Sequence, residues 1–510
     1  MLAKVFSFGL FGIEPYPIAI EVDVSWGLPA VTLVGMADTA IRESKERVKS
    51  AIKNSGFDWP HERITVNLAP SDIKKEGSCF DLAIALGVLA ATEQLDAEKL
   101  KEYFILGELS LDGSLRPVQG ILPISAAVAK NKIRNLIVPA DNAAEAAVAG
   151  GSSAFGVKTL KQTVEFIHSP DMLMPYKVDL RELFQENSNY QFDFSEVKGQ
   201  HAAKRAVEVA VAGNHNILLI GPPGSGKTML AKRIPTIMPE LSLEEALEVT
   251  KIHSVAGVLS KREGLLSRRP FRSPHHCISN VALVGGGSTP KPGEISLAHQ
   301  GVLFLDELPE FRRDCLEALR QPLEDGTIHI SRAARSLTFP ASFVLTAAMN
   351  PCPCGSLGNI KSACRCNTTA VYKYRSKISG PLLDRIDIHI EVPPARYQEL
   401  SADLPAESSA QIKERVEKAR SVQRIRFSGE SIISNARMSH KQVRKFCALG
   451  KEENELLKMA MSELNFSARA YDKILKVSRT IADLAGSEDI NAEHLSEAIQ
   501  YRSLDREFFI

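Results

Sequence analysis

Apolar and polar residues along the first part of the chain alternate with the periods of strands and helices. Between residues 18 and 24 every second position is apolar, which predicts a half-buried strand. Residues 39–54 predict a helix with one charged face, and residues 81–92 predict a buried helix. Further short apolar runs predict strands at 31–35, 64–68, 103–109 and 136–139. Residues 1–170 are therefore expected to form a mixed α/β domain.

A polar stretch with scattered prolines breaks this periodicity and predicts a linker at 171–192. The next segment, 193–398, predicts an α/β core that begins with a helix at 200–212 and a strand at 216–220. Later apolar runs at 301–305 and 341–346 predict two more strands of this core. The last segment, 399–510, is rich in charged residues at helical spacing and predicts a helical domain.

The overall composition excludes several classes of protein. The chain has 510 residues, with 62 Lys and Arg against 61 Asp and Glu, so its formal net charge is +1. This balance excludes a globally basic nucleic-acid coat but permits a local basic patch. No apolar run reaches the roughly 18 residues of a membrane span, and the N-terminus has no signal-peptide pattern, so we expect a cytoplasmic protein without membrane partners. Eight cysteines are too few for a disulfide scaffold.

A glycine-rich turn follows the predicted strand at 216–220. Its sequence, Gly221-Pro-Pro-Gly224-Ser225-Gly226-Lys227-Thr228, matches G-x-x-x-x-G-K-[ST] in full and opens a predicted helix. Glycines let backbone N–H groups close around phosphate oxygens, and the helix N-terminus adds its positive end. Lys227 is expected to reach the β- and γ-phosphates of ATP, and the Thr228 hydroxyl is expected to ligate Mg²⁺.

Two later strand ends supply polar partners for this phosphate site. Asp306 and Glu307 follow the apolar run Val302-Leu-Phe-Leu, so Asp306 is a candidate Mg²⁺ ligand and Glu307 a candidate base for the attacking water. Asn350 ends the next apolar strand and could orient that water, although Asn-Pro is also a common turn starter. Arg385, in Leu-Asp-Arg-Ile-Asp, is either a surface ion-pair partner or an arginine finger that reaches a neighbour's γ-phosphate.

Four cysteines cluster just after Asn350. Cys352, Cys354, Cys364 and Cys366 lie within fifteen positions, which suits one tetrahedral Cys₄ site, most plausibly a structural Zn²⁺. C-x-C pairs are tighter than the usual spacing, so redox-active thiols, a vestigial site or an iron–sulfur cluster stay open as alternatives.

Basic residues gather in two insertions of the core, where they could track a phosphate backbone in a salt-sensitive way. Subunit salt bridges or nucleotide contacts are the alternatives for the same residues. The few aromatic residues nearby favour backbone contact over base reading. The candidate DNA-binding residues are Lys261, Arg262, Arg268, Arg269 and Arg272 in the first insertion, and Arg332 and Arg335 at the tip of a predicted hairpin in the second.

Taken together, these motifs resemble the ComM/YifB family of magnesium-chelatase-like AAA+ ATPases. The runs Arg-Pro-Phe-Arg-Ser-Pro-His-His276 and Ser467-Ala-Arg469-Ala-Tyr add to this resemblance, which covers essentially the whole chain. The resemblance implies a hexameric ring with Asn350 as sensor 1, Arg385 as a finger acting in trans and Arg469 as sensor 2 in a C-terminal lid. It also implies branch migration of single-stranded and branched DNA during homologous recombination, as in natural transformation, with recombination proteins as partners.

The first domain resembles Lon-protease-like domains of the ribosomal S5-type fold. Cys79 stands where that family has its nucleophilic Ser, and Leu122 stands where it has its Lys. A thiol without a visible base is a small hydrophobe, so we expect this domain to be proteolytically inactive. The sequence therefore favours an ATP-driven DNA helicase. The alternative is a chelatase-like motor that remodels a protein or metal-inserting partner.

Overall fold

The computed structural model describes residues 2–36, 38–75, 77–180, 190–259, 264–287, 290–331, 336–357, 363–394, 406–430, 432–464 and 466–504. The chain divides into two compact units. The first consists of Met1–Ser188, Leu243–Ser267 and Thr289–Lys291, and the second of the remaining residues. Each unit has its own sheet and is described by itself.

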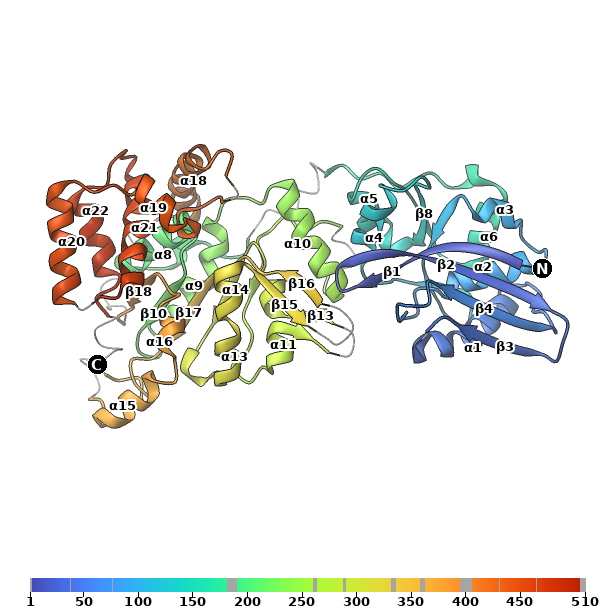
Figure 1. Cartoon of the computed structure of the whole chain (residues 1–510), viewed down its shortest axis with the longest axis horizontal. Helices are drawn as coiled ribbons and strands as arrows, with labels where there is room; N and C mark the ends of the chain where they lie inside the picture. The colour runs from blue at the N-terminus through green and yellow to red at the C-terminus, as the bar shows by residue number, and fades with distance from the viewer. Residues whose placement is uncertain are drawn as a thin grey trace. The chain divides into compact units, whose positions relative to one another are not determined.

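The first unit is built on a seven-stranded mixed sheet (Figure 1). Its strand order is β3-β4-β2-β1-β5-β8-β9. The β1–β2 and β2–β4 pairs are antiparallel and the other pairs are parallel. The strands are β1 (Leu2–Phe11), β2 (Glu14–Ser25), β3 (Ala30–Val34), β4 (Arg63–Ala69), β5 (Tyr103–Ile105), β8 (Asn135–Pro139) and β9 (Ser153–Val157).

Apolar side chains project from both faces of this sheet, and helices cover both faces. In β8, Ile137 joins the core beneath α2, whereas Leu136 and Val138 join the core beneath α4. Such runs of apolar residues are typical of strands that are buried on two faces. The helices are α1 (Thr39–Asn54), α2 (Asp81–Ala91), α3 (Ala97–Leu100), α4 (Ile121–Val128), α5 (Ala143–Val148) and α6 (Leu160–His168).

The predicted mixed α/β character is confirmed, and one strand prediction is wrong. Residues 103–109 do not form one strand, because the chain leaves the sheet after β5. There the Gly107 N–H donates to the Cys79 carbonyl at 2.8 Å, and the Gly107 carbonyl accepts from Leu82 at 3.0 Å. The remaining residues form the two-residue strand β6 (Glu108–Leu109), which pairs with β7 (Leu115–Arg116).

A segment from the middle of the sequence also packs within the first unit. Helix α10 (Leu243–Ala256) lies against α4, where the Ser254 hydroxyl donates to the buried Glu145 carboxylate. The Ser254 carbonyl accepts from the Gly120 N–H at 3.2 Å. Burial raises the pKa of Glu145, although the donors around it oppose this rise. Residues 243–267 therefore belong by packing to the unit that contains the N-terminal sheet.

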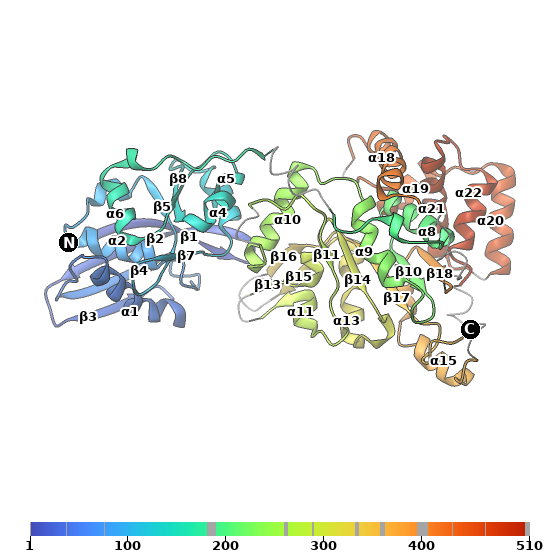
Figure 2. The same cartoon turned by 180° about the vertical axis from the view of Figure 1, so that it is seen from behind.

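The second unit contains a five-stranded sheet in the order β11-β14-β17-β10-β18 (Figure 2). All four strand pairs are parallel. Helices α8 (His201–Gly213) and α9 (Lys227–Ile237) share a buried core with this sheet. The strands are β10 (Ile217–Ile220), β11 (Phe271–Arg272), β14 (Val302–Leu305), β17 (Val344–Met349) and β18 (Ile388–Glu391).

Strand β17 starts three residues later than the sequence pattern predicts. The Ala341 N–H donates to the Gly326 carbonyl at 2.8 Å, so Ala341 still belongs to the preceding hairpin. That hairpin consists of β15 (Thr327–Ser331) and β16 (Ser336–Pro340), and its last pair joins Ser331 to Ser336. The predicted hairpin is thus confirmed.

The C-terminal helices pack on α8 and share its core (Figure 1). Ile412 and Val416 of α18 and Ile474 and Ile481 of α21 are fully buried there. In the part of the chain that the structure describes, no helix has both the length and the apolar character to cross a bilayer. These helices are α18 (Ser409–Arg426), α19 (His440–Phe446), α20 (Lys451–Glu463), α21 (Ala468–Ala485) and α22 (Ala492–Gln500).

Candidate functional site

The glycine-rich turn connects the end of β10 to the start of α9. Gly224 and Gly226 have φ angles of 75° and 94°, which favour residues without a Cβ. The Lys227 ammonium group donates to the carbonyls of Gly221 at 2.6 Å and Pro222 at 2.9 Å. Burial lowers the pKa of Lys227, while nearby carboxylates oppose the shift. A bound phosphate would offer this lysine stronger, charged acceptors than its own loop does.

The acidic pair lies close to the same turn. The Thr228 hydroxyl donates to Asp306 Oδ2 at 2.8 Å, so the two predicted Mg²⁺ ligands are adjacent. Asp306 also orients the next residue, because its Oδ1 accepts from the Glu307 N–H at 3.0 Å. Both acids follow β14, which lies two strands from β10 in the parallel sheet. The carboxyl ends of such strands are where open α/β sheets bind ligands.

Asn350 lies between these two elements. It follows β17, the strand that separates β10 from β14. Its Oδ1 accepts from the Lys227 ammonium group at 3.3 Å. The sheet therefore brings Lys227, Thr228, Asp306, Glu307 and Asn350 to one edge, as the spacing along the sequence predicts.

His276 is a neighbour of Glu307 to which sequence reasoning assigned no role. Its Nδ1 lies 3.4 Å from Glu307 Oε2, and its ring lies tilted against that of His275 with 4.1 Å between centroids. His276 follows β11, and β11 pairs with β14, the strand that carries the acids. That strand pairing was the missing signal, because β11 has only two residues and no recognisable period.

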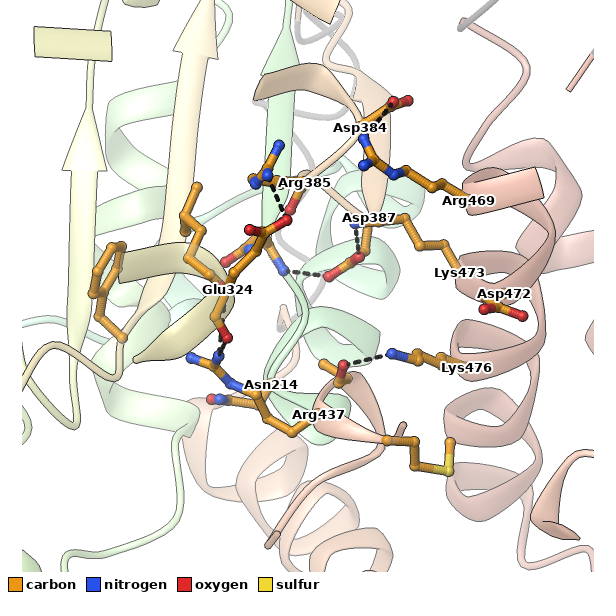
Figure 3. A pocket seen from close by; sticks show the side chains of 15 residues that line it. Asn214, Glu324, Asp384, Arg385, Asp387, Arg437, Arg469, Asp472, Lys473 and Lys476 are labelled. Atoms are coloured by element: carbon orange, nitrogen blue, oxygen red, sulfur yellow. Dashed lines mark hydrogen bonds and ion pairs between the residues drawn. The ribbon is translucent and has the colours of Figure 1, made fainter. Parts of the chain in front are cut away.

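The other two arginines of interest line a pocket of about 350 Å³ at the opposite edge of the sheet (Figure 3). Asn216, Phe343 and Asp387 line it, and each directly precedes a strand of the parallel sheet. The pocket therefore lies at the amino ends of the strands, whereas the glycine-rich turn lies at their carboxyl ends. Its charged lining residues are Glu324, Asp384, Arg385, Asp387, Arg437, Arg469, Asp472, Lys473 and Lys476.

Arg385 and Arg469 lie near each other in this pocket and each contacts a carboxylate. Arg385 is paired with Glu324, and its side chain is 15% exposed. Its buried Nε has no hydrogen-bond partner among the described residues. Arg469, on α21, is 3.6 Å from Asp384 and 63% exposed. Figure 3 shows Arg385 next to Glu324 and Arg469 next to Asp384.

The floor of the pocket is held by a buried ionic network. Asp387 pairs with Lys473 and lies 3.5 Å from His215 Nδ1. Although burial opposes it, Lys473 and His215 hold the pKa of Asp387 well below its usual range. The Asp387 carboxylate also accepts from the Asn216 N–H at 3.0 Å. The network fixes the loop that carries Arg385 to the strand that carries the glycine-rich turn.

The four clustered cysteines converge on one point. Sγ of Cys352 lies 3.4 Å from that of Cys354 and 3.6 Å from that of Cys364, and Cys354 and Cys364 are 3.7 Å apart. The Sγ atoms of all four, including Cys366, lie within 4.8 Å of one another. A tetrahedral Zn²⁺ with bonds of about 2.3 Å places its sulfurs about 3.8 Å apart. The arrangement is compatible with one such ion.

The candidate DNA-binding residues have different environments. Arg269 is buried and donates to the carbonyls of Pro239, Gln300 and Glu240, which favours a structural role. Arg272 makes two hydrogen bonds of 2.6 Å to Glu294. The Arg268 guanidinium lies over the Tyr190 ring at 5.9 Å. Lys261, Arg262, Arg332 and Arg335 lie outside the described residues.

Comparison with known proteins decides the family. Models described as magnesium chelatase, subunit ChlI, and as its C-terminal part match residues 193–400 and 406–502, and one described as subunit ChlI of Mg-chelatase matches 20–142. The protein YifB of Escherichia coli strain K12 is 45% identical over 510 residues, which is 99% of this chain and 98% of YifB. This chain belongs to the ComM/YifB family of magnesium-chelatase-like AAA+ proteins.

Two further relatives carry names that state a role. Competence protein ComM of Haemophilus influenzae is 44% identical over 509 residues, which is 99% of this chain and 98% of ComM. The magnesium-chelatase 38 kDa subunit of Rhodobacter capsulatus is 24% identical over 178 residues, 31% of this chain and 50% of that subunit. Membership of this AAA+ family indicates ATPase activity and an oligomeric assembly.

Proposed function

We propose that this chain is the subunit of a hexameric ring that hydrolyses ATP to translocate single-stranded and branched DNA. The observation that carries the proposal is the division of charged groups between the two edges of the five-stranded sheet. Lys227, Asp306 and Glu307 lie at the carboxyl edge, and Arg385 and Arg469 lie at the amino edge. The five residue-to-residue steps from Asn216 to Gly221 span roughly 16 Å of extended chain. One subunit therefore cannot apply both sets to one nucleotide.

In a ring, the amino edge of one subunit would meet the nucleotide on the carboxyl edge of the next. Thr228 and Asp306 would hold Mg²⁺ on the β- and γ-phosphates, and Lys227 would neutralise their charge. Asn350 would orient a water molecule, whose proton Glu307 accepts as oxygen attacks the γ-phosphorus and the bond to ADP breaks. Arg385 from the neighbour would stabilise the charge on the transferred group, and Arg469 would act as sensor 2.

DNA is the proposed substrate of the motion. The relative ComM is named a competence protein. The β15–β16 hairpin holds Arg332 and Arg335 between its paired ends, and Arg268 and the basic residues 261–262 precede β11. Basic loops of this kind would follow a phosphate backbone. A role in branch migration during homologous recombination, as in transformation, follows from this combination.

The N-terminal sheet domain is proposed to be a proteolytically inactive, Lon-protease-like module. Burial, followed by the nearby Asp81 carboxylate, raises the pKa of the Cys79 thiol to about 12. A thiol with such a pKa stays protonated at neutral pH and is a poor nucleophile. The side chain at the position of the family's Lys is Leu122, which is fully buried and has no amine. We propose packing, ring assembly or partner contact as the role of this domain.

The decisive experiment uses the purified chain with a labelled four-way junction and a fork, with and without ATP and Mg²⁺. We expect salt-sensitive binding in both conditions and conversion of the junction to duplex arms only with ATP. The matched control is Glu307→Gln, which should bind the junction without converting it. A ring that hydrolyses ATP and leaves both DNAs unchanged would contradict the proposal.

The second candidate is a chelatase-like motor that remodels a protein or metal-inserting partner. The similarity to the magnesium-chelatase 38 kDa subunit favours it. It predicts a ring that hydrolyses ATP and leaves both the junction and the fork unchanged, so the same assay separates the two functions.

A further inference from the structure

The cysteine cluster lies directly against the proposed ATP site. The backbone of Gly355, in the turn after Cys354, approaches Pro223 of the glycine-rich turn so closely that a Cβ would fall 2.5 Å from Pro223 Cδ. We propose that a zinc ion bound by Cys352, Cys354, Cys364 and Cys366 positions the ATP site through this contact. The inference rests on the proposed ATP turnover, and it adds that this turnover depends on a metal that never touches the nucleotide.

The first cysteine pair is attached to the strand that carries Asn350. Cys352 follows Asn350 by two residues and is fully buried. The turn between Cys352 and Gly355 is tight, because the Gly355 N–H donates to the Cys352 carbonyl at 3.0 Å. A displacement of Cys352 or Cys354 would therefore shift Gly355 against Pro223 and move the backbone next to Asn350.

The second cysteine pair is attached to helix α15 (Thr368–Arg375). Asn367, next to Cys366, caps this helix by accepting from the Ala370 N–H at 2.8 Å. The other end of α15 returns to the ATP site, where Arg375 Nε donates to the Pro351 carbonyl at 3.3 Å. Burial raises the pKa of the Tyr374 hydroxyl, and the nearby Asn350 backbone opposes this rise, so the Tyr374 side chain lies close to Asn350. Both arms of the cluster thus lead to residues 350–351.

A metal ion would close this loop, because the four thiols have no covalent bond between them. Four thiolates held about 3.8 Å apart repel one another unless a cation binds them. Without the ion, the two cysteine pairs would separate and Gly355 would lose its fixed position. Since four protein ligands leave no open coordination site, the ion acts on ATP only by positioning Asn350 and Pro223.

The first test removes the metal. We expect about one zinc ion per wild-type chain and none in a Cys354→Ser, Cys366→Ser double variant. The variant should lose ATP turnover by about 10-fold or more, the usual effect of losing support around a site. Cys79→Ser, which changes a thiol of the other unit, should keep both metal and turnover. Wild-type protein that contains no zinc, or a zinc-free variant with full turnover, would overturn the proposal.

The second test keeps the metal and breaks the contact. Gly355 has a φ of 75° and contacts Pro223, whereas Gly429 has a φ of 85° and would have no atom within 4 Å of a Cβ. Gly355→Ala and Gly429→Ala therefore impose similar backbone strain, and only the first pushes on the ATP site. We expect both variants to keep zinc and only Gly355→Ala to bind Mg²⁺–ATP about 10-fold more weakly.

Equal affinity in the two glycine variants would overturn the positioning role even if zinc is present. ATP turnover of the wild-type protein tests the proposed motor function separately from the zinc contact. If it binds zinc but hydrolyses no ATP, the proposed motor function is wrong and nucleotide affinity in the glycine variants still tests the contact.

Discussion

The two edges of the five-stranded sheet hold different sets of charged groups. At the carboxyl edge, Lys227 and Thr228 are satisfied by short contacts to their own loop and to Asp306. At the amino edge, Arg385 and Arg469 contact the carboxylates Glu324 and Asp384. The first edge holds the groups proposed to bind phosphate and metal, and the second holds the two arginines proposed to act on a neighbour's nucleotide. Under the proposed mechanism, one chain on its own therefore holds an incomplete catalytic site.

The contacts of the amino edge bear on the proposed role of Arg385. Arg385 is largely buried against Glu324, so in the proposed ring a neighbour's nucleotide would have to compete with that ion pair. The γ-phosphate of ATP carries more charge than one carboxylate, so ATP would compete better than ADP. Under the proposed mechanism, the position of Arg385 would therefore depend on the nucleotide bound to the next subunit.

The largest expected effect tests whether the two edges act on one nucleotide. Arg385→Ala should reduce ATP turnover by roughly 10³-fold, the usual effect of losing an arginine finger. In mixed rings with Glu307→Gln subunits, activity should recover in part, because some interfaces then combine an intact Glu307 with an intact Arg385. ATP hydrolysis measured across mixing ratios checks this. No recovery at any ratio would mean that both residues serve the same subunit.

The next effect isolates the chemistry of the carboxyl edge. Glu307→Gln should bind Mg²⁺–ATP normally and lose turnover by about 10²-fold or more, because the amide cannot accept a proton from water. Nucleotide affinity and single-turnover hydrolysis measure the two parts separately. Glu310→Gln is the control. Glu310 lies three residues after Glu307 and pairs with Lys377 at 3.0 Å, so its substitution should leave turnover unchanged. Equal loss in both variants would point to folding of the loop.

A smaller effect is expected from Arg469, which is more exposed than Arg385. Arg469→Ala should reduce turnover by about 10-fold, because a charge-assisted contact of about 1.5–3 kcal/mol to phosphate is lost. The exposed Arg424→Ala on α18 is the control and should keep wild-type turnover. If Arg469→Ala hydrolyses ATP normally while Arg385→Ala does not, the amino edge contributes only one group.

The carboxyl edge could be predicted from the sequence far better than the amino edge. Asp306 and Asn350 each follow an apolar run, and Lys227 follows the glycine-rich turn after a third run. A parallel sheet brings such strand ends together whatever the loops between them do. Helix α1 was likewise predicted at its observed bounds from the local spacing of its polar and apolar residues, and the structure adds that Asp38 caps its start. The pocket of Arg385 and Arg469 depends on α21 packing against a loop 80 residues away, which no local pattern encodes.

Other features depended on contacts between distant segments in the same way. The pairing of β11 with β14 brings His276 to Glu307, and Gly355 meets Pro223 across more than a hundred residues. The packing of α10 within the first unit is decided by Ser254 and Glu145. The sequence shows only that Arg269 lies in a basic segment. Its hydrogen bonds to three backbone carbonyls, seen in the structure, indicate that it joins separate backbone segments.

The smallest expected effect concerns DNA and leaves both edges intact. Arg332→Ala with Arg335→Ala should lower the slope of log affinity against log salt by about 2, one for each lost phosphate contact. Turnover without DNA should not change, because the proposed ATP chemistry uses neither arginine. The exposed Arg444→Ala on α19 is the control for a loss of charge far from the hairpin. If the Arg332→Ala, Arg335→Ala protein and the wild-type protein show the same slope, the hairpin does not contact the phosphate backbone.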